Sequence, residues 1–374
     1  MAALLECLIK LSEKAGNLAR IIRSENALFQ LLVERKDDIL KNDDSFVQDF
    51  KTLGDVLIQE MIRFEIQKKF ANLAERVYGE ETNKFTNTLG DTVTVSIQPT
   101  VSQTAEILNK ILNSNKEAAQ LLAQALHEDV TVEVGSKVKS LDLDMDFDSL
   151  GIWIDPIDGT SEFIKGKSDS EPEEGIYPSG LQCALVLIGV FDIHTGEPVM
   201  GVINQPFTEN TEDGRWQGRV LWGVCHKDVM ASSFSARQST NNSIKCIVSS
   251  AEKEEYTTNL SKLGKVCTSC GAGYKMLCVI EELVDAYFVS KGQTYKWDTC
   301  APHALLRSIG GGIVDFEATV KCNQSREARL QKKELVYHKP DADDLDEKNR
   351  WSNTGGLIAY RGEECLEKII HAFC

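Results

Sequence analysis

The stretch WIDPIDGTSEFIKG, residues 153–166, places two carboxylates three residues apart around a proline. Asp155 and Asp158 follow LGIW, which is typical of the end of a buried strand. Pro156 has a fixed φ and no N–H, so we expect a sharp turn that projects both carboxylates to one side and leaves the Ile157 carbonyl facing the same space. Mg²⁺ prefers oxygen ligands of this kind. The stretch therefore predicts a divalent-cation site.

The residues that follow predict a phosphate site beside those cations. Gly159 and Thr160 open a short helical pattern, SEFIKG. N–H groups at the start of a helix bind phosphate, and glycine allows a ligand to approach the backbone closely. The alternative is that Asp158 only caps this helix.

Further acids stand at other element boundaries, far apart in the sequence. Glu80 and Glu81 lie in YGEE, Asp55 lies in KTLGD, and Asp298 lies in KWDTCAPHALLRSIGGG. Each has an ordinary explanation when taken alone: a solvated charge pair, a capping box begun by Thr52, and a helix N-cap. Read jointly, they are candidates for one metal-binding cluster.

Composition restricts the class of protein. The chain has 374 residues, of which 42% are hydrophobic and 26% charged, and its formal net charge is -16. This balance is typical of a globular protein and argues against unaided binding to nucleic acid or to an acidic membrane. No stretch reaches the roughly 18 apolar residues of a membrane-spanning helix. Eleven scattered cysteines and a start without a signal-peptide pattern predict a cytoplasmic protein.

Apolar spacing predicts helices over residues 2–35 and 52–70, followed by strand-rich segments from about residue 90, among them residues 91–98. After a polar loop, strands alternate with helices that we expect to begin at Ala251, Tyr274 and Thr299. We therefore expect an α+β part over residues 1–240 and an α/β part over residues 241–374, forming one compact catalytic unit. Residues 168–175, SDSEPEEG, have the composition of a mobile acidic surface loop.

Two long motifs resemble a known family. WIDPIDGTSEFIK and WDTCAPHALLRSIGG are similar to the two signatures of the magnesium-dependent, lithium-inhibited phosphomonoesterases, which include inositol monophosphatases and, more distantly, fructose-1,6-bisphosphatase. The resemblance implies a layered α-β-α-β-α sandwich. YGEE, GVINQPF, GAGYK and GGLIAYR are most similar to the branch that removes the 1-phosphate of inositol 1,4-bisphosphate and inositol 1,3,4-trisphosphate. The alternative branch is the 3'(2'),5'-bisphosphate nucleotidases, which act on adenosine 3',5'-bisphosphate.

The resemblance also implies roles for individual residues. The implied metal ligands are Asp55, Glu80, Glu81, Asp155, the Ile157 carbonyl, Asp158 and Asp298. Catalytic roles fall to Thr160, which orients the attacking water, together with Glu80 and Asp55. The implied substrate contacts are Asp158, Gly159, Thr160, Lys253, Gly271, Ala272 and Lys275.

Two positions depart from the pattern expected in the inositol polyphosphate branch. Gly159 and Ala251 both stand where that branch is expected to carry serine. Neither residue belongs to the implied metal set. The resemblance further implies two or three Mg²⁺ per site, inhibition by Li⁺ or Ca²⁺, small-molecule inositol phosphates as partners, and a monomer.

Overall fold

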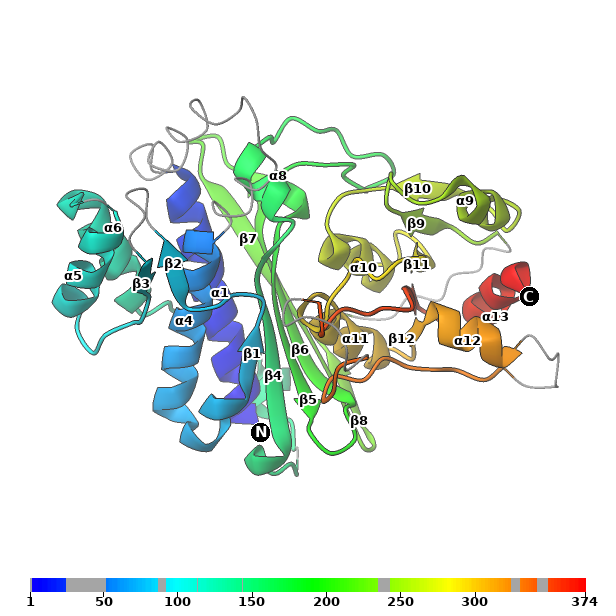
Figure 1. The fold of residues 1–374 in the computed structure, drawn as a ribbon, viewed down its shortest axis with the longest axis horizontal. Helices are drawn as coiled ribbons and strands as arrows, with labels where there is room; N and C mark the ends of the chain where they lie inside the picture. Colours follow the sequence, from blue (N-terminus) through cyan, green and yellow to red (C-terminus); the bar gives the residue numbers. More distant parts are fainter. Residues whose placement is uncertain are drawn as a thin grey trace.

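The computed structural model describes residues 2–24, 52–86, 92–112, 114–142, 144–234, 243–323, 330–341 and 349–374. Its elements stack in five layers (Figure 1): helices, a six-stranded sheet, the helices α10 and α11, a five-stranded sheet, and outer helices. Three groups of buried apolar side chains fill the spaces between these layers. The predicted α-β-α-β-α sandwich is thus confirmed.

The first sheet is built from long apolar strands because both of its faces are covered. β1 pairs parallel with β4, and the remaining neighbours are antiparallel. In sheet order the strands are β1 (Val77–Gly79), β4 (Leu150–Asp158), β5 (Leu185–Asp192), β6 (Pro198–Asn210), β7 (Trp216–His226) and β8 (Val229–Ser232).

The outer face of this sheet is covered mainly by α1 (Ala2–Ser24) and α4 (Thr52–Lys69). The predicted stripe from Leu4 to Ile22 is buried; the predicted continuation of the first helix, from residue 25 to 35, lies outside the described residues. The second predicted helix is confirmed to within one residue at its end. The neighbouring elements are η1 (Ala71–Arg76), β2 (Lys84–Thr86), β3 (Thr92–Thr94), α5 (Val101–Ile111), α6 (Lys116–His127), α7 (Ser136–Lys139) and η2 (Phe147–Ser149).

The strand predicted over residues 91–98 is shorter than expected. β3 pairs with β2 over three residues only, and the next apolar residues, Val95 and Ile97, are buried in the core. The Val95 N–H still donates to the Asn83 carbonyl at 2.8 Å, one residue beyond β3.

The middle layer holds α10 (Ala272–Ile280) and α11 (Lys296–Arg307), and both begin earlier than predicted. Gly271, with a φ of 71°, provides the N-cap of α10. The Asp298 carboxylate accepts the Tyr295 N–H at 2.6 Å, so Asp298 is the third residue of α11, and Pro302 lies inside the helix rather than in its first turn.

The five-stranded sheet has the order β10 (Val266–Thr268), β9 (Cys246–Val248), β11 (Ala286–Val289), β13 (Leu357–Tyr360) and β12 (Gly312–Asp315). Its outer face carries α9 (Glu254–Ser261), α12 (Phe316–Asn323) and α13 (Glu363–Phe373). α9 begins three residues later than predicted, because the Ala251 N–H bonds to the Ser249 hydroxyl in a preceding turn. The division at residue 240 stays a prediction; the first sheet uses strands before it and the second uses strands after it.

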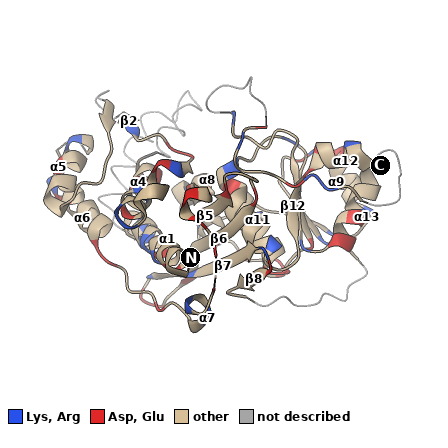
Figure 2. Ribbon diagram, turned by 90° about the horizontal axis from the view of Figure 1, so that it is seen from below, with Lys and Arg blue, Asp and Glu red and all other residues tan. Residues whose placement is uncertain are grey.

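Acidic and basic residues are interspersed along elements on both sides of the molecule (Figure 2). None of the described helices is both long enough and apolar enough to cross a membrane. The acidic segment 168–175 is exposed, as predicted, but it is not a free loop: ion pairs attach Glu173 and Glu174 to lysines of the second sheet.

Candidate active site

A β-bulge aims the two aspartates of β4 at one point. Asp155 lies opposite Leu187 of β5 and Asp158 lies opposite Leu185, so three steps on β4 match two steps on β5. Residues three apart on a regular strand point to opposite faces, and one extra residue returns Asp158 to the face of Asp155. Our prediction of a sharp turn at Pro156 was therefore wrong: the strand continues to Asp158 because the pairing with β5 resumes after the bulge.

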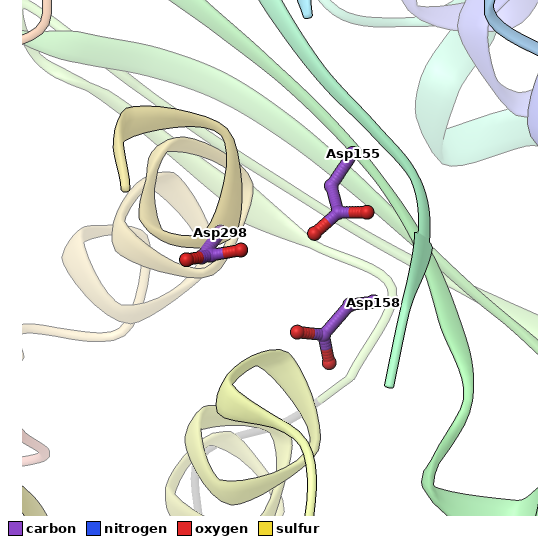
Figure 3. Close-up of side chains that lie close together, drawn as sticks. All are labelled: Asp155, Asp158 and Asp298. Carbon is purple, nitrogen blue, oxygen red and sulfur yellow. The ribbon is translucent and has the colours of Figure 1, made fainter. Parts of the chain in front are cut away.

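The bulged strand faces the start of α11, and three carboxylates meet there. Figure 3 shows Asp155 and Asp158 projecting from the end of β4 toward Asp298. One ligand oxygen from each lies within 4.8 Å of the others, and all three side chains are buried. We call these three residues the acid cluster.

Burial makes the acid cluster electrostatically unfavourable without a cation. Burial, and then the charges of Glu80, Asp158 and Asp298, raise the pKa of Asp155 well above its ordinary value. Burial and the neighbouring Asp158 raise the pKa of Asp298 to about 8. Asp155 Oδ1 is buried and accepts no hydrogen bond from the described residues. Converging, desolvated carboxylates with an open lone pair fit a divalent cation, whose charge would compensate theirs.

Asp158 is held by the N-terminus of α10, not by the helix that follows it. Its Oδ2 accepts the Gly273 N–H at 3.0 Å. Burial raises its pKa, and this N–H together with Lys275 and neighbouring N–H groups opposes that rise. α8 (Thr160–Lys165) takes Gly159 as its N-cap instead. Asp158 thus does cap a helix, but that helix is α10, more than a hundred residues later in the chain, and not the helix that follows Asp158.

Gly159 shapes residues 158–160, where the sequence predicts phosphate binding and which we call the phosphate turn. This residue has a φ of 78°, and a Cβ at this position would lie 2.8 Å from the Cys183 carbonyl oxygen. The Thr160 hydroxyl donates to the Ile157 carbonyl at 2.8 Å. This bond orients the Thr160 hydroxyl, which keeps both of its acceptor lone pairs, and the Ile157 carbonyl keeps a second lone pair.

Glu80 follows β1 beside the acid cluster. Gly79 pairs with Ile154, and the Glu80 N–H donates to the Ile154 carbonyl at 3.3 Å. Glu80 therefore follows the end of β1 beside Asp155 of the neighbouring strand β4. Its charge raises the pKa of Asp155 and Asp298. The side chain is exposed and lies outside the group of three.

Gln59, which the sequence patterns did not single out, holds the backbone of Glu81. Its amide donates to the Glu81 carbonyl at 2.6 Å and accepts the Glu81 N–H at 3.1 Å. The sequence held one indication of this: Gln59 follows Asp55 by four residues, so both lie on the same face of the predicted helix.

Asp55 is buried in the first turn of α4. A Cβ on Gly54 would lie 3.8 Å from Ile157 Cδ1, which places this turn against the bulge of β4. Asp55 is not a member of the acid cluster.

The predicted substrate contacts fall in two environments. Lys275 is buried; its ammonium donates to the carbonyls of Gly271 at 2.6 Å and Ser269 at 3.3 Å and lies 5.2 Å from the ring centroid of Tyr287. Burial lowers its pKa, and Asp158 opposes that shift. Gly271 and Ala272 start α10 next to Asp158.

Lys253 is different, because its side chain is exposed and its ammonium lies 5.5 Å from the Tyr256 ring centroid. Tyr256 packs against Phe316 and Phe373 on the outer face of the second sheet. In this conformation Lys253 is not joined to the acid cluster, and Ala251 is exposed beside it.

Residues 57–363 match the inositol monophosphatase family. This chain belongs to that family. It is 43% identical over 387 residues to inositol polyphosphate 1-phosphatase of Mus musculus, an alignment that covers 99% of this chain and 96% of the mouse protein. It is 31% identical to 3'(2'),5'-bisphosphate nucleotidase 1 of Dictyostelium discoideum, over only 45% of this chain and 52% of the relative.

Solved structures support the fold independently. An inositol monophosphatase from Anabaena superposes with a TM-score of 0.52 at 13% identity, covering 99% of this chain and 94% of that chain. At such low identity this likeness shows the fold alone.

Proposed function

We propose that this family member is a Mg²⁺-dependent phosphomonoesterase that removes the 1-phosphate of inositol polyphosphates, with inositol 1,4-bisphosphate and inositol 1,3,4-trisphosphate as its substrates. The observation that carries the proposal is the acid cluster set directly against the phosphate turn. The full-length relative at 43% identity supports the choice of substrate. The proposal includes two or three Mg²⁺, inhibition by Li⁺ or Ca²⁺, a monomer and a cytoplasmic location.

In this proposal Asp155, Asp158 and Asp298 hold the cations, with Asp55, Glu80, Glu81 and the Ile157 carbonyl completing the ligand set. When bound, Mg²⁺ compensates the carboxylate charge, polarises the phosphoryl oxygens and lowers the pKa of water.

The chain's own groups then bind and orient the reactants. The backbone at Gly159 approaches the phosphate without a side chain in the way. Thr160, held by the Ile157 carbonyl, accepts a hydrogen bond from the attacking water, and Glu80 takes its proton. The leaving inositol oxygen would face the cation position that Asp158 and Asp298 line, and it would take a proton from solvent water.

Distal parts of the substrate would lie against the start of α10. Lys275 has three N–H donors, of which two bond to carbonyls. We assign its remaining donor to a second phosphate, and the Gly271–Ala272 backbone to the inositol ring. Lys253 reaches the substrate only after its ammonium leaves the Tyr256 ring.

A paired-substrate assay tests the proposal. Release of inorganic phosphate is measured from inositol 1,4-bisphosphate and from adenosine 3',5'-bisphosphate, with Mg²⁺ titrated from zero. We expect turnover of the inositol substrate that requires Mg²⁺ and a much smaller kcat/KM for the nucleotide. The nucleotidase alternative has support from relatives that align over less than half of this chain, and the reverse preference would establish it. Absence of Mg²⁺-dependent release from both substrates would reject the proposal.

A further inference from the structure

The segment from residue 167 to 180, which we call the strap, connects α8 to η3 (Leu181–Cys183). Its tip is a tight turn in which Glu173 and Ile176 exchange backbone hydrogen bonds of 2.9 and 3.0 Å. Glu174 stands in this turn with a φ of 50°. The turn presents the two glutamates together, outward from the first sheet.

Two lysines of the second sheet hold the tip. Glu174 pairs with Lys245 at 2.6 Å and with Lys265 at 3.0 Å, and Glu173 pairs with Lys265 at 2.8 Å. Lys245 directly precedes β9 and Lys265 directly precedes β10, which are parallel neighbours. The two ammonium groups therefore lie at the same end of these two strands, and with the two glutamates they form one network of four charges.

The strap then follows β10, the edge strand of the sheet. The Ser269 hydroxyl donates to the Tyr177 carbonyl at 2.6 Å, and the Cys270 N–H donates to the Pro178 carbonyl at 3.2 Å. The Tyr177 N–H donates to the Tyr274 hydroxyl of α10 at 2.9 Å. The body of the strap is thus bonded to the segment that leads into α10.

The other end of the strap is bonded to α8. The Gly180 N–H donates to Glu162 Oε2 at 2.8 Å, and the Leu181 N–H donates to the Lys167 carbonyl at 2.8 Å. Glu162 is buried on α8, the helix that begins at Thr160. One continuous segment therefore joins the helix of the phosphate turn to the second sheet.

The two strands that follow these lysines, β9 and β10, lead directly into the predicted substrate contacts. β9 runs into residues 249–253 and β10 runs into residues 269–272, and we call these two segments the substrate loops. We propose that Glu173, Glu174, Lys245 and Lys265 are positioning residues that set the substrate loops against the phosphate turn, so that they determine affinity for the inositol part of the substrate but not the chemical step. This inference rests on the proposed function of the same site.

Charge swaps test the network. Half-exposed ion pairs contribute little singly, but placing two lysines against two lysines adds repulsion to the loss of attraction. We expect the pair Glu173→Lys and Glu174→Lys to raise KM for inositol 1,4-bisphosphate about fivefold, with kcat changed less than about twofold. Adding Lys245→Glu and Lys265→Glu to this variant re-forms the pairs with opposite polarity, and we expect it to restore KM.

Two controls separate this effect from damage elsewhere. Lys332→Glu breaks the ion pair with Glu363, which is also 2.6 Å long but lies on the outer side of the second sheet, and it should leave KM unchanged. A simple aryl phosphate reports on the metal site and phosphate turn alone, so its kcat/KM should be the same in all variants. The inference is overturned if KM is unchanged in the variant with Glu173→Lys and Glu174→Lys, which we call the two-lysine variant. It is also overturned if the variant with all four charges exchanged, the fourfold swap, folds but does not recover the original KM.

Hydrogen exchange provides a readout that needs no turnover. We expect amides of residues 266–272 to exchange faster in the two-lysine variant and to regain their protection in the fourfold swap. Equal protection in every variant would overturn the inference even if the enzyme is active. Restored protection combined with no Mg²⁺-dependent phosphate release by the unmodified chain would reject the proposed function instead.

Discussion

The acid cluster and the start of α10 lie side by side, yet their electrostatics differ. In the cluster, burial and mutual repulsion raise the pKa of Asp155 and Asp298, and no ammonium or guanidinium group among the described residues pairs with them within 4.0 Å. At the start of α10 the polar groups have partners: Asp158, the third member of the acid cluster, accepts a helix N–H that opposes the rise in its pKa, and Lys275 donates to two carbonyls. The carboxylates of the first region therefore need protons or a cation to offset their repulsion, whereas at the second region groups of the protein itself already supply hydrogen-bond partners.

The largest effect should come from removing one carboxylate of the cluster. Asp155→Asn keeps the shape of the side chain but removes the charge that a cation requires, and we expect kcat to fall by at least about a thousandfold. Asp315→Asn is a matched control, because Asp315 is a partly buried aspartate whose carboxylate accepts the Ala318 N–H at the start of α12. Phosphate release and thermal melting are measured for both. Near-normal turnover by a folded Asp155→Asn variant would contradict the metal assignment.

The pH dependence of stability should show which region needs a ligand. In the native chain the raised pKa of Asp298, about 8, keeps a proton that the unfolded chain releases near pH 4. Native protein then binds more protons than unfolded protein, so its free energy of unfolding should fall as pH rises between about 4 and 8, by up to about 1.4 kcal/mol per pH unit per proton. Saturating Mg²⁺ should flatten this slope, because the cation replaces the protons.

Urea unfolding at pH 5.5, 6.5 and 7.5, in chelator and in excess Mg²⁺, measures the two slopes. Asp298→Asn removes one titrating group and should reduce the slope in chelator. Parallel curves with and without Mg²⁺ would show that the acid cluster does not bind the cation.

The region at the start of α10 should respond through substrate affinity. Lys275→Met keeps the apolar stem and removes the ammonium, and we expect KM for inositol 1,4-bisphosphate to rise about tenfold while kcat changes little. A substrate without a distal phosphate, inositol 1-phosphate, should lose less. Lys262→Met, at an exposed lysine whose ammonium donates to the Asn259 side chain at 2.8 Å, is the control. An equal loss for both substrates would assign Lys275 to the shape of the Gly271 turn instead of to a distal phosphate.

The two regions also differ in what the sequence could predict. Asp155, Asp158 and Asp298 stand in compact motifs with proline, glycine and helix-start signals, and the structure brings them together. The bulge that aligns the first two was missed because it depends on pairing with β5, and the capping of α10 by Asp158 was missed because its partner is over a hundred residues away. The helices over residues 2–24 and 52–69 were predictable from local periodicity. Gln59 and the ion pairs of Glu174 carry no comparable local signal.

The smallest effect concerns Gly159, which directly follows Asp158 of the acid cluster. Gly159→Ser introduces the residue expected in the inositol polyphosphate branch into a φ of 78° and places its Cβ 2.8 Å from the Cys183 carbonyl oxygen. Gly214→Ser is the matched control, since Gly214 has a φ of 77° and open space around it. Both substitutions should cost about 1 kcal/mol for the left-handed backbone, measured by urea unfolding. Gly159→Ser should cost more and also lower kcat severalfold, because the phosphate turn must move away from Cys183. Equal costs at the two glycines, with kcat unchanged, would show that the turn accommodates serine without displacement.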